Sequence, residues 1–407
     1  MTDKYSELRR KYERLIYHGF TVQPGKLTFR FSIGEHNFMP EWTFDVPLTG
    51  NIDQFAFNLG MAELVSYWKC ACPPLVEVRC GALDEWQIAW WKKLYRNGLG
   101  EFFYRNGIEA GDDFMQITAT GKELPVPDVR ELSGCLIPVG GGKDSAVTLE
   151  LLNEQRDTNI CYIIGDIQSA KNCAEAAGYN GERVINVSRT IDPVLLTLNR
   201  QGYLNGHTPF SSVVAFSSLL FAYMAGKKYI VLSNESSANE GNVAGNADVN
   251  HQYSKSVEFE RDFREYNARL GMDYPEYFSL LRPLNEVQIT KLFVQSPQYF
   301  GVFRSCNAGS KANVWCNRCA KCLYVYVMLS AWLDEEALTA IFGENLLIKP
   351  ELAGMLEALR NPDRDKPFEC VGTREEVNRS LDKQTDALLD YFDDNNFIPD
   401  DFMRLLI

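Results

Sequence analysis

Short apolar runs alternate with longer segments of helical spacing through the middle of the chain. The apolar runs lie at 136–139, 159–164, 183–187 and 229–232. Runs of this length are typical of buried strands, and their alternation with helical segments predicts a parallel sheet covered by helices. Ligands bind such sheets outside the carboxyl ends of the strands, so polar residues that follow these runs are the first candidates for a site.

The first 130 residues follow another pattern. Alternating polar and apolar positions at 26–33 and 41–46 predict a β-ribbon, and helical spacing at 58–69 and 84–95 predicts two helices. The tryptophans of the second helix are expected to pack in the core. Nothing in this pattern points to chemistry, and the role of this region stays open.

The rest of the chain predicts mainly helices, including 257–270 and 286–293, and ends in short helices rich in Asp and Glu. We therefore expect an α/β protein in three parts. These are an α+β domain at 1–130, a domain with a parallel sheet at 131–305, and a helical region at 306–407.

Length and charge narrow the classes of protein. At 407 residues, the chain is long enough for two or three domains with their own cores. A net charge of −13 argues against a nucleic-acid partner, because such surfaces carry a basic stripe. The chain starts with charged residues rather than a signal peptide, and its longest apolar-rich segment, 211–226, is too short to span a bilayer. We expect a cytoplasmic protein without a membrane partner; the oligomeric state stays open.

A glycine-rich turn follows the first apolar run of the middle region. Its residues are Gly140, Gly141, Gly142, Lys143, Asp144 and Ser145. A strand, turn and helix start of this kind presents backbone N–H groups and a helix dipole to a phosphate. The turn does not fit a Walker A loop, in which Ser or Thr follows the lysine, or a dinucleotide fingerprint, which needs Gly or Ala at position 145. It is therefore interpreted as a phosphate loop of another kind.

Polar residues are also found where other predicted strands end. Asp166 follows the second strand, where it is either a contact to a ribose or adenine amine or a plain turn residue. Asn234 and Glu235 follow the fourth strand and open a long polar loop, 234–256. Long loops in compact domains tend to be functional, so this one is interpreted as a substrate loop rather than a plain surface loop.

The candidates for acid–base chemistry lie in this loop and in an earlier polar turn. His251, Tyr253 and Lys255 fall within five residues, directly after Asn250. His207 lies in a turn that either binds an anion or only caps the next helix. An unperturbed imidazole titrates near neutral pH, which makes His251 the first choice for a general base.

Four of the eleven cysteines are clustered. They are Cys306, Cys316, Cys319 and Cys322. Two C-x2-C steps that share one cysteine, with a fourth cysteine upstream, match the spacing of a tetrahedral zinc site. Four thiolates leave no open position for a substrate, so the zinc is expected to be structural; an iron–sulfur cluster or unligated thiols are the alternatives. Most of the other cysteines are expected to be small buried residues.

The glycine-rich turn resembles the Ser-Gly-Gly-x-Asp-Ser loop of the ATP pyrophosphatase (PP-loop) superfamily, with Gly140 in place of the first serine. The resemblance implies a PP-loop fold for 131–305 that binds ATP and splits it between the α- and β-phosphates. Together with the Leu-Arg-Pro-Leu segment at 281–284 and the cysteine cluster, the turn also resembles the deazaguanine synthases, which activate a carboxylate with ATP. The effect of Gly140 on adenylation stays open.

A longer series of motifs is similar to another family of this superfamily. The motifs lie at 95–102, 140–145, 205–209, 234–238, 249–256, 278–284, 315–322 and 370–372. In this order they resemble the ATP-dependent UDP-N-acetylmuramoyl-L-alanyl-L-glutamate epimerases over most of the chain. The resemblance implies an enzyme of peptidoglycan precursor synthesis that inverts the terminal L-glutamate of this substrate through an acyl-adenylate. AMP and pyrophosphate are then the products of ATP.

The resemblance also implies roles for the candidate residues. The turn at 140–145 binds the phosphates, Lys143 stabilises charge on the transferring group, and Mg²⁺ accompanies ATP. Adenylation neutralises the substrate carboxylate, so that a general base can remove the α-proton. The candidate acids and bases are His251, Tyr253, Lys255 and His207. The candidate substrate contacts are Asn234, Glu235, Asn250 and Arg282.

Two other functions stay open on the sequence alone. One is another carboxylate-activating PP-loop enzyme, which forms an amide or nitrile or carries out thiolation. The other is a zinc-stapled nucleotide sensor that binds ATP without turnover. Whether an epimerase of this kind uses one base or two is also open.

Overall fold

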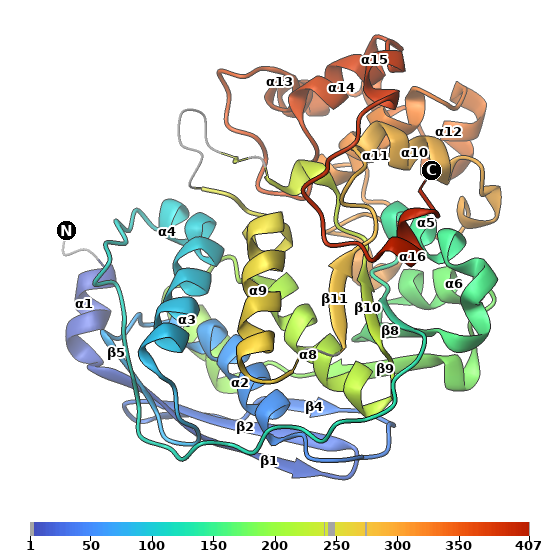
Figure 1. Cartoon of the computed structure of the whole chain (residues 1–407). Helices are drawn as coiled ribbons and strands as arrows, with labels where there is room; N and C mark the ends of the chain where they lie inside the picture. Colours follow the sequence, from blue (N-terminus) through green and yellow to red (C-terminus); the bar gives the residue numbers. More distant parts are fainter. Residues whose placement is uncertain (1–3, 240, 243–248, 273–274, 407) are drawn as a thin grey trace. The chain divides into compact units, whose positions relative to one another are not determined.

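The structure is a computed structural model that describes residues 4–239, 241–242, 249–272 and 275–406. It is a mixed α/β protein (Figure 1). The chain divides into two compact units, each made of segments that are distant in sequence. Unit 1 comprises 1–132, 186–228 and 262–276, and unit 2 comprises 133–185, 229–261 and 277–407. The three-part division expected from the sequence stays a prediction.

Unit 1 contains a mixed sheet. Its strands are β1 (Arg14–Gln23), β2 (Lys26–Ile33), β3 (His36–Phe38), β4 (Glu41–Thr43), β5 (Leu75–Val78) and β6 (Gln116–Ala119). β1 pairs antiparallel with β2 and parallel with β5, β5 pairs parallel with β6, and β2 also pairs antiparallel with β3 and β4. The predicted strand at 26–33 is confirmed, and the second strand of the ribbon ends early, at Thr43. β1 was not predicted, because a register shift between Tyr17 and Gly19 interrupts its alternation.

The helices of unit 1 cover this sheet (Figure 1). They are α1 (Lys4–Lys11), α2 (Asp53–Trp68), α3 (Glu85–Gly98), α4 (Gly100–Arg105), α7 (Pro193–Arg200) and α8 (Phe210–Met224). α2 is buried from Gln54 to Trp68 and packs on β1 and β2. The approach is close: a Cβ on Gly60 would lie 1.9 Å from the Tyr17 hydroxyl. Trp90 and Trp91 of α3 are buried, which confirms the core position predicted for them, whereas Trp86, for which the same position is predicted, is only half-buried.

The parallel sheet predicted for the middle of the chain is confirmed in unit 2. Its strands are β7 (Cys135–Pro138), β8 (Ile160–Ile164) and β10 (Tyr229–Leu232), joined by β11 (Glu276–Ser279) in the order β11-β10-β7-β8. β7 pairs parallel with both β8 and β10. β9 (Val184–Arg189) and helix α9 (Val257–Arg269) each begin in unit 2 and end in unit 1.

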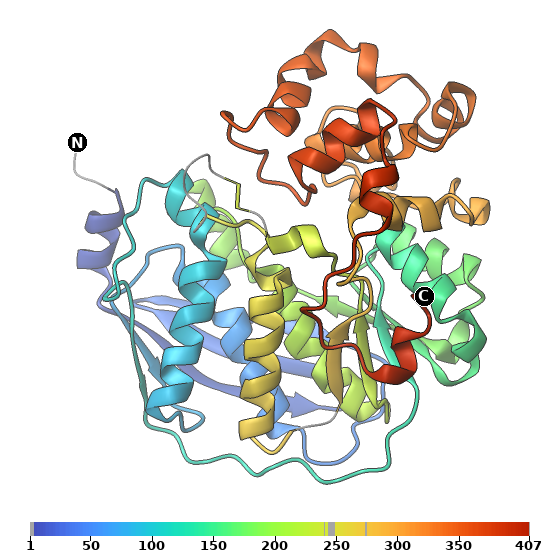
Figure 2. The same ribbon diagram turned by 45° about the horizontal axis from the view of Figure 1, so that its top comes forward.

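The helices of unit 2 include two beside the sheet, α5 (Lys143–Leu151) and α6 (Gln168–Ala176). The others are α10 (Glu286–Phe293), α11 (Ala320–Ser330), α12 (Glu335–Phe342), α13 (Ala353–Arg360), α14 (Arg374–Leu381), α15 (Asp386–Leu389) and α16 (Asp400–Met403). Figure 2 shows α10 to α14 gathered around α11, whose residues from Ala320 to Leu329 are all buried. Because each large apolar side chain contributes about 1.5–3 kcal/mol on full burial, α11 is the central core element of this region.

Short 3₁₀ turns connect several of these elements. They lie at Asn153–Thr158, Gly181–Arg183, Ser236–Asn239, Tyr253–Lys255, Pro297–Tyr299, Ser310–Ala312, Leu346–Ile348 and Pro350–Leu352.

Candidate functional site

The glycine-rich turn joins β7 to α5, as the sequence predicts. Gly141 has a φ of +81°, and a Cβ there would lie 2.5 Å from the backbone nitrogen of Ala170, so both conformation and space require glycine. The backbone N–H of Gly140 donates to the Ser145 Oγ at 3.1 Å, which closes the turn onto the first turn of the helix. Backbone N–H groups at a helix start of this kind favour an anion.

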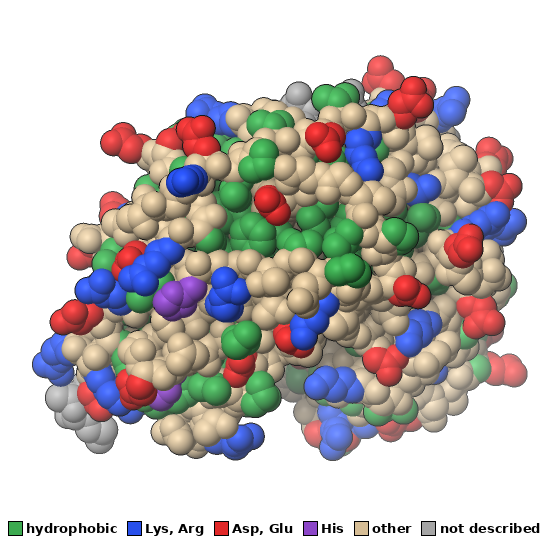
Figure 3. All heavy atoms as spheres, turned by 90° about the horizontal axis from the view of Figure 1, so that it is seen from below, with side chains coloured by type: hydrophobic (Ala, Val, Ile, Leu, Met, Phe, Trp, Pro, Cys, Tyr) green, Lys and Arg blue, Asp and Glu red, His purple; other side chains and the backbone are tan. Residues whose placement is uncertain are grey.

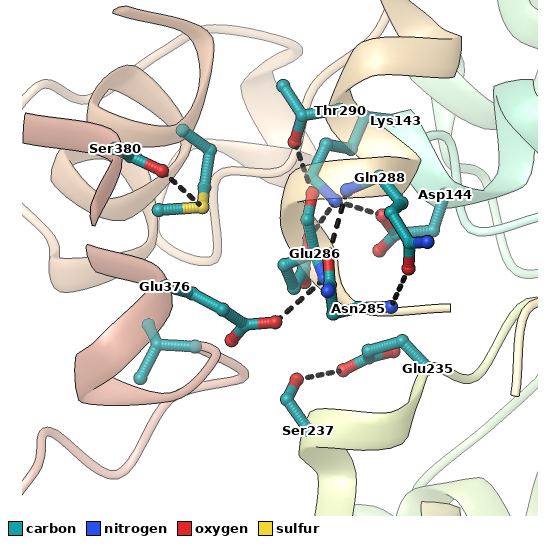
Figure 4. A network of polar contacts seen from close by, with 12 residues as sticks. Lys143, Asp144, Glu235, Ser237, Asn285, Glu286, Gln288, Thr290, Glu376 and Ser380 are labelled. Atoms are coloured by element: carbon teal, nitrogen blue, oxygen red, sulfur yellow. Dashed lines mark hydrogen bonds and ion pairs between the residues drawn. The ribbon is translucent and has the colours of Figure 1, made fainter. Parts of the chain in front are cut away.

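Lys143 is fully buried behind this turn. Its Nζ forms ion pairs with the Asp144 Oδ1 and the Glu286 Oε2 (Figure 4). Burial lowers the pKa of Lys143, but the two carboxylates outweigh burial and raise it above its ordinary value. Lys143 is therefore a fixed cation inside unit 2.

Three carboxylates, those of Asp144, Glu235 and Glu286, lie close to one another near the Lys143 ammonium. Oxygens of Asp144, Glu235 and Glu286 all lie within 4.8 Å of one another, and the two glutamates are buried. Burial raises the pKa of Glu286 to about 7, against the opposing effect of Lys143. Burial acts in the same direction on Asp144, but Lys143 and Lys321 lower the pKa of Asp144 below its ordinary value. The cluster thus holds more negative than positive groups and suits an added cation.

The glutamate at the start of α10 is held in place by its neighbours. Asn285 and Gln288 form a capping box at the start of the helix, in which each side chain accepts from the other's backbone N–H. The Glu376 Oε1 accepts from the Glu286 backbone N–H at 2.8 Å. Figure 4 shows the Glu376 carboxylate of α14 pointing toward the backbone N–H of Glu286 at the start of α10. These contacts orient Glu286 toward Lys143.

Arg282 lies beside the cluster and is fully buried. Its guanidinium donates to the backbone carbonyls of Glu235, at 2.6 Å, and Lys255, at 2.5 Å. It also forms an ion pair with the Glu260 Oε2 at 3.0 Å. Arg282 therefore fixes two segments of the predicted substrate loop; direct contact with substrate, as the sequence suggests, stays a prediction.

The predicted loop 234–256 belongs to unit 2. The structure describes all of its residues except 240 and 243–248. Asn234 donates from Nδ2 to the Ser279 Oγ at 3.0 Å, and Asn250 donates to the Ala238 carbonyl at 2.9 Å. The His251 N–H donates to the Asn242 Oδ1 at 2.8 Å. Tyr253 is buried. The loop is thus tied down by its own polar side chains.

Two of the candidates form ion pairs or close contacts with other residues of their own units. Asp166, after β8, is largely exposed, and its Oδ1 forms an ion pair with Lys171 at 2.5 Å. His207 belongs to unit 1, where its Nδ1 lies 3.4 Å from the Glu101 Oε2. The functions predicted for Asp166 and His207 stay predictions.

The four clustered cysteines come together as their spacing predicts. All four sulfurs lie within 4.8 Å of one another, and the pairs Cys306–Cys319 and Cys316–Cys322 are 4.0 and 3.8 Å apart. Thiolates around a tetrahedral zinc ion lie roughly 3.8 Å apart. The Gly309 N–H donates to the Cys306 Sγ at 3.0 Å. The site thus fits a metal ion bound by four sulfurs.

Sequence reasoning missed three residues of the site region. Glu286 and Glu376 were not singled out, although Glu286 directly follows the Arg-Pro-Leu-Asn segment and occupies the first turn of its helix. Cys370 falls in one of the motifs, 370–372, but the sequence gives it no role in the site; it is half-buried, and its Sγ lies 3.3 Å from the Lys255 Nζ. Five of the other cysteines, Cys70, Cys72, Cys135, Cys161 and Cys173, are buried as expected.

Figure 3 shows one face of the molecule, on which basic and acidic side chains are interspersed around apolar ones. On that face, the described residues form no basic stripe. Among the described residues, no helix combines the length and the apolar character that crossing a membrane requires.

Comparisons with known proteins agree over most of the chain. Models of the MurL N-terminal domain and the MurL C-terminal domain match residues 7–280 and 302–392. A UDP-N-acetyl-alpha-D-muramoyl-L-alanyl-L-glutamate epimerase of Xanthomonas oryzae pv. oryzae is 36% identical over 78% of this chain and 71% of its own. Epimerases of the same name from Micromonospora sp. and Salinispora tropica are each 33% identical, over 91% and 88% of this chain and 86% and 81% of their own.

Proposed function

Because this chain belongs to the MurL family, we propose that it inverts the terminal L-glutamate of UDP-N-acetylmuramoyl-L-alanyl-L-glutamate to D-glutamate. The product is then a peptidoglycan precursor. The observation that supports this function most strongly is the buried cluster of Lys143, Asp144, Glu235 and Glu286 behind a glycine-rich turn. Such a cluster has charges of both signs at the point where a phosphate and a cation would meet.

We propose that the reaction consumes ATP. The α-carbon of a free glutamate carboxylate is a poor acid, because removing its proton places a second negative charge beside the first. Transfer of AMP to that carboxylate makes a mixed anhydride in which the carboxyl group no longer carries a charge, so its carbonyl accepts the electron pair of the α-carbon. After inversion, water would hydrolyse the anhydride and release AMP and the free carboxylate of the product. The N–H groups of the 140–145 turn would bind the phosphates, and Lys143 would stabilise the charge that develops during transfer.

The acidic part of the cluster fits Mg²⁺. Mg²⁺ prefers oxygen ligands and is usually held by one or two carboxylates together with substrate phosphates. Asp144, which is partly exposed, and Glu235 would be these carboxylates, while Glu286 keeps Lys143 in position. When bound, the ion would offset the charge of the pyrophosphate leaving group.

The cysteine cluster fits a structural Zn²⁺, and we assign it that role. Its four sulfurs fill all positions of a tetrahedron, so the ion would stabilise the connection before α11 without touching substrate. The strand order, the parallel pairing and the turn at 140–145 support a PP-loop fold for the sheet of unit 2.

The test is pyrophosphate release from ATP and Mg²⁺ by the full chain, with and without UDP-N-acetylmuramoyl-L-alanyl-L-glutamate. The glutamate of the product is hydrolysed and resolved on a chiral column. We expect release only with the substrate, together with D-glutamate in the product. Substrate-dependent release without inversion would leave an adenylating enzyme of another kind, and absence of release would show that the chain does not activate this substrate.

A further inference from the structure

Cys370 lies in a part of unit 2 that the activation chemistry does not use. The Lys255 Nζ donates to the Cys370 Sγ at 3.3 Å, and the His251 side chain hydrogen-bonds the same sulfur. One sulfur thus meets two groups of the predicted substrate loop. Both are basic side chains that the sequence singles out for acid–base chemistry.

Several hydrogen bonds hold the segment around Cys370, residues 366–371, against the predicted substrate loop. The Lys366 N–H donates to the Asn242 carbonyl at 2.8 Å, and the Asn242 Nδ2 donates to the Pro367 carbonyl at 3.1 Å. Gln252 adds a bond to the Val371 carbonyl at 3.4 Å. These bonds lie on both sides of Cys370 in the sequence, so the sulfur is held against the loop.

Glu369, the residue before Cys370, ties the same segment to α11. Its carboxylate accepts from the backbone N–H groups of Ala320, at 3.2 Å, and Lys321, at 2.9 Å. A carboxylate at a helix N-terminus is stabilised by the helix dipole. The cysteine is therefore positioned from two directions, by the loop and by the start of α11.

The charge around Cys370 differs from that around the other cysteines. Burial alone would raise the pKa of its thiol, but Lys255 and His251 outweigh burial and lower it to about 6. Cys80 of unit 1 is also half-buried, yet burial raises the pKa of its thiol to about 12. At neutral pH, Cys370 is therefore a thiolate and Cys80 a thiol.

Lys255 connects this thiolate to the acidic cluster. Its charge interacts with Cys370 and also with Glu235 and Asp144. In the proposed function, Asp144 and Glu235 hold the cation at the phosphates, so the activated carboxyl group forms close to them. The Cys370 sulfur contacts Lys255, whose charge acts on both of these carboxylates.

We propose that Cys370 is the catalytic base that removes the α-proton of the activated glutamate. The inference rests on the proposed function. The thiolate sulfur forms an S–H bond as the Cα–H bond breaks, and the electron pair moves onto the carbonyl oxygen of the acyl-adenylate. Water then protonates the opposite face of the α-carbon, and the resulting hydroxide takes the thiol proton through His251. The thiolate and one water molecule are regenerated.

The experiment compares the full-length protein with its Cys370→Ala variant in D2O, with ATP, Mg²⁺ and UDP-N-acetylmuramoyl-L-alanyl-L-glutamate. Cys80→Ser is the matched control, because Cys80 is half-buried in unit 1 and lies outside the site. Two rates are measured: substrate-dependent pyrophosphate release, and deuterium incorporation at the α-carbon with inversion. We expect Cys370→Ala to keep pyrophosphate release within about threefold and to lose incorporation and inversion by at least about 100-fold, the usual scale of acid–base catalysis. Cys80→Ser should keep both.

The outcomes separate the inference from the function on which it rests. If wild-type protein fails to release pyrophosphate with the substrate, the proposed function fails. If wild-type protein is active and Cys370→Ala inverts glutamate at a similar rate, or loses release together with inversion, Cys370 is not the base.

A second measurement decides the state of the thiol without enzyme activity. Iodoacetamide at pH 7 is followed by mass spectrometry of the labelled peptides. A thiolate at Cys370 should react at least about 30-fold faster than Cys80, after allowance for the lower nucleophilicity of a low-pKa thiol. Lys255→Met should slow the labelling of Cys370 about tenfold. Equal reactivity of Cys370 and Cys80 would overturn the proposal even if a Cys370 variant fails to fold.

Discussion

Two buried acidic groups, one in each unit, meet their cations in different ways. In unit 1, Glu63 is fully buried, and both of its oxygens accept from the Arg189 guanidinium, at 2.5 and 2.7 Å. The Trp42 Nε1 adds a third bond at 2.8 Å. In unit 2, Glu286 shares Lys143 with Asp144, and Glu235 lies close by.

The difference lies in the balance of charge. The Glu63 carboxylate has one guanidinium to itself, and such a bidentate pair completes its own hydrogen bonding. The Lys143 ammonium faces several carboxylates, so the cluster in unit 2 stays short of positive charge. A balanced buried pair stabilises the fold, whereas an unbalanced one is suited to a ligand that supplies the missing charge.

The largest expected effect is the loss of unfolding free energy when the balanced pair of Glu63 and Arg189 is broken. Glu63→Ala leaves the Arg189 charge buried without its partner, which should cost about 3–5 kcal/mol of unfolding free energy in a urea titration. Glu265→Ala is the control, because its pair with Arg269 is exposed and should contribute less than about 0.5 kcal/mol. If Glu63→Ala costs less than about 1 kcal/mol, the pair is not the structural element that its geometry indicates.

In the unbalanced cluster, the corresponding substitution, Glu286→Gln, should lower the rate of the reaction rather than the stability of the protein. Glu286→Gln removes one of the competing carboxylates but leaves Asp144 as a partner for Lys143. At pH 7, we expect the unfolding free energy to change by less than about 1 kcal/mol, while substrate-dependent pyrophosphate release falls about 100-fold, or ~2.7 kcal/mol. Equal losses of stability in Glu286→Gln and Glu63→Ala would remove the distinction between the two regions.

The sequence predicts one side of this comparison better than the other. Glycines at 140–142 and the C-x2-C spacing predict a turn and a metal site, because local geometry decides both. Glu286 lies 143 residues from Lys143 in sequence, and Cys370 lies 115 from Lys255. Such pairs depend on the packing of α10 and of the segment after α13, which no local pattern encodes. β1 was not predicted for a local reason: the bulge between Tyr17 and Gly19 breaks the alternation of polar and apolar positions along the strand.

The pH dependence of stability gives a smaller effect with a defined sign. Burial raises the pKa of Glu286 from its ordinary value of 4.5 to about 7, so folding favours the protonated form. Its contribution to stability is therefore fully present below about pH 4.5 and is lost as the pH rises through about 7. The loss is about 3 kcal/mol over the whole range, of which about 2.5 kcal/mol falls between pH 5 and pH 8.

Metal-free wild-type protein is compared with Glu286→Gln by urea titration between pH 5 and pH 8. Subtracting the variant cancels the titration of other groups, and the difference should fall as the pH rises. A flat difference would mean that Glu286 does not carry this shift.

The smallest expected effect comes from supplying the missing charge. If Mg²⁺ binds the folded cluster and not the unfolded chain, a tenfold excess over its dissociation constant stabilises the protein by RT ln 11, about 1.4 kcal/mol. Thermal unfolding with MgCl₂, and with KCl at equal ionic strength, measures this gain. Glu235→Gln should reduce it by removing one oxygen ligand and one negative charge, whereas Glu265→Gln, at an exposed pair in unit 1, should leave it unchanged. A gain that is the same in wild type and Glu235→Gln would place the bound cation elsewhere, and the cluster would then resemble the balanced pair of unit 1.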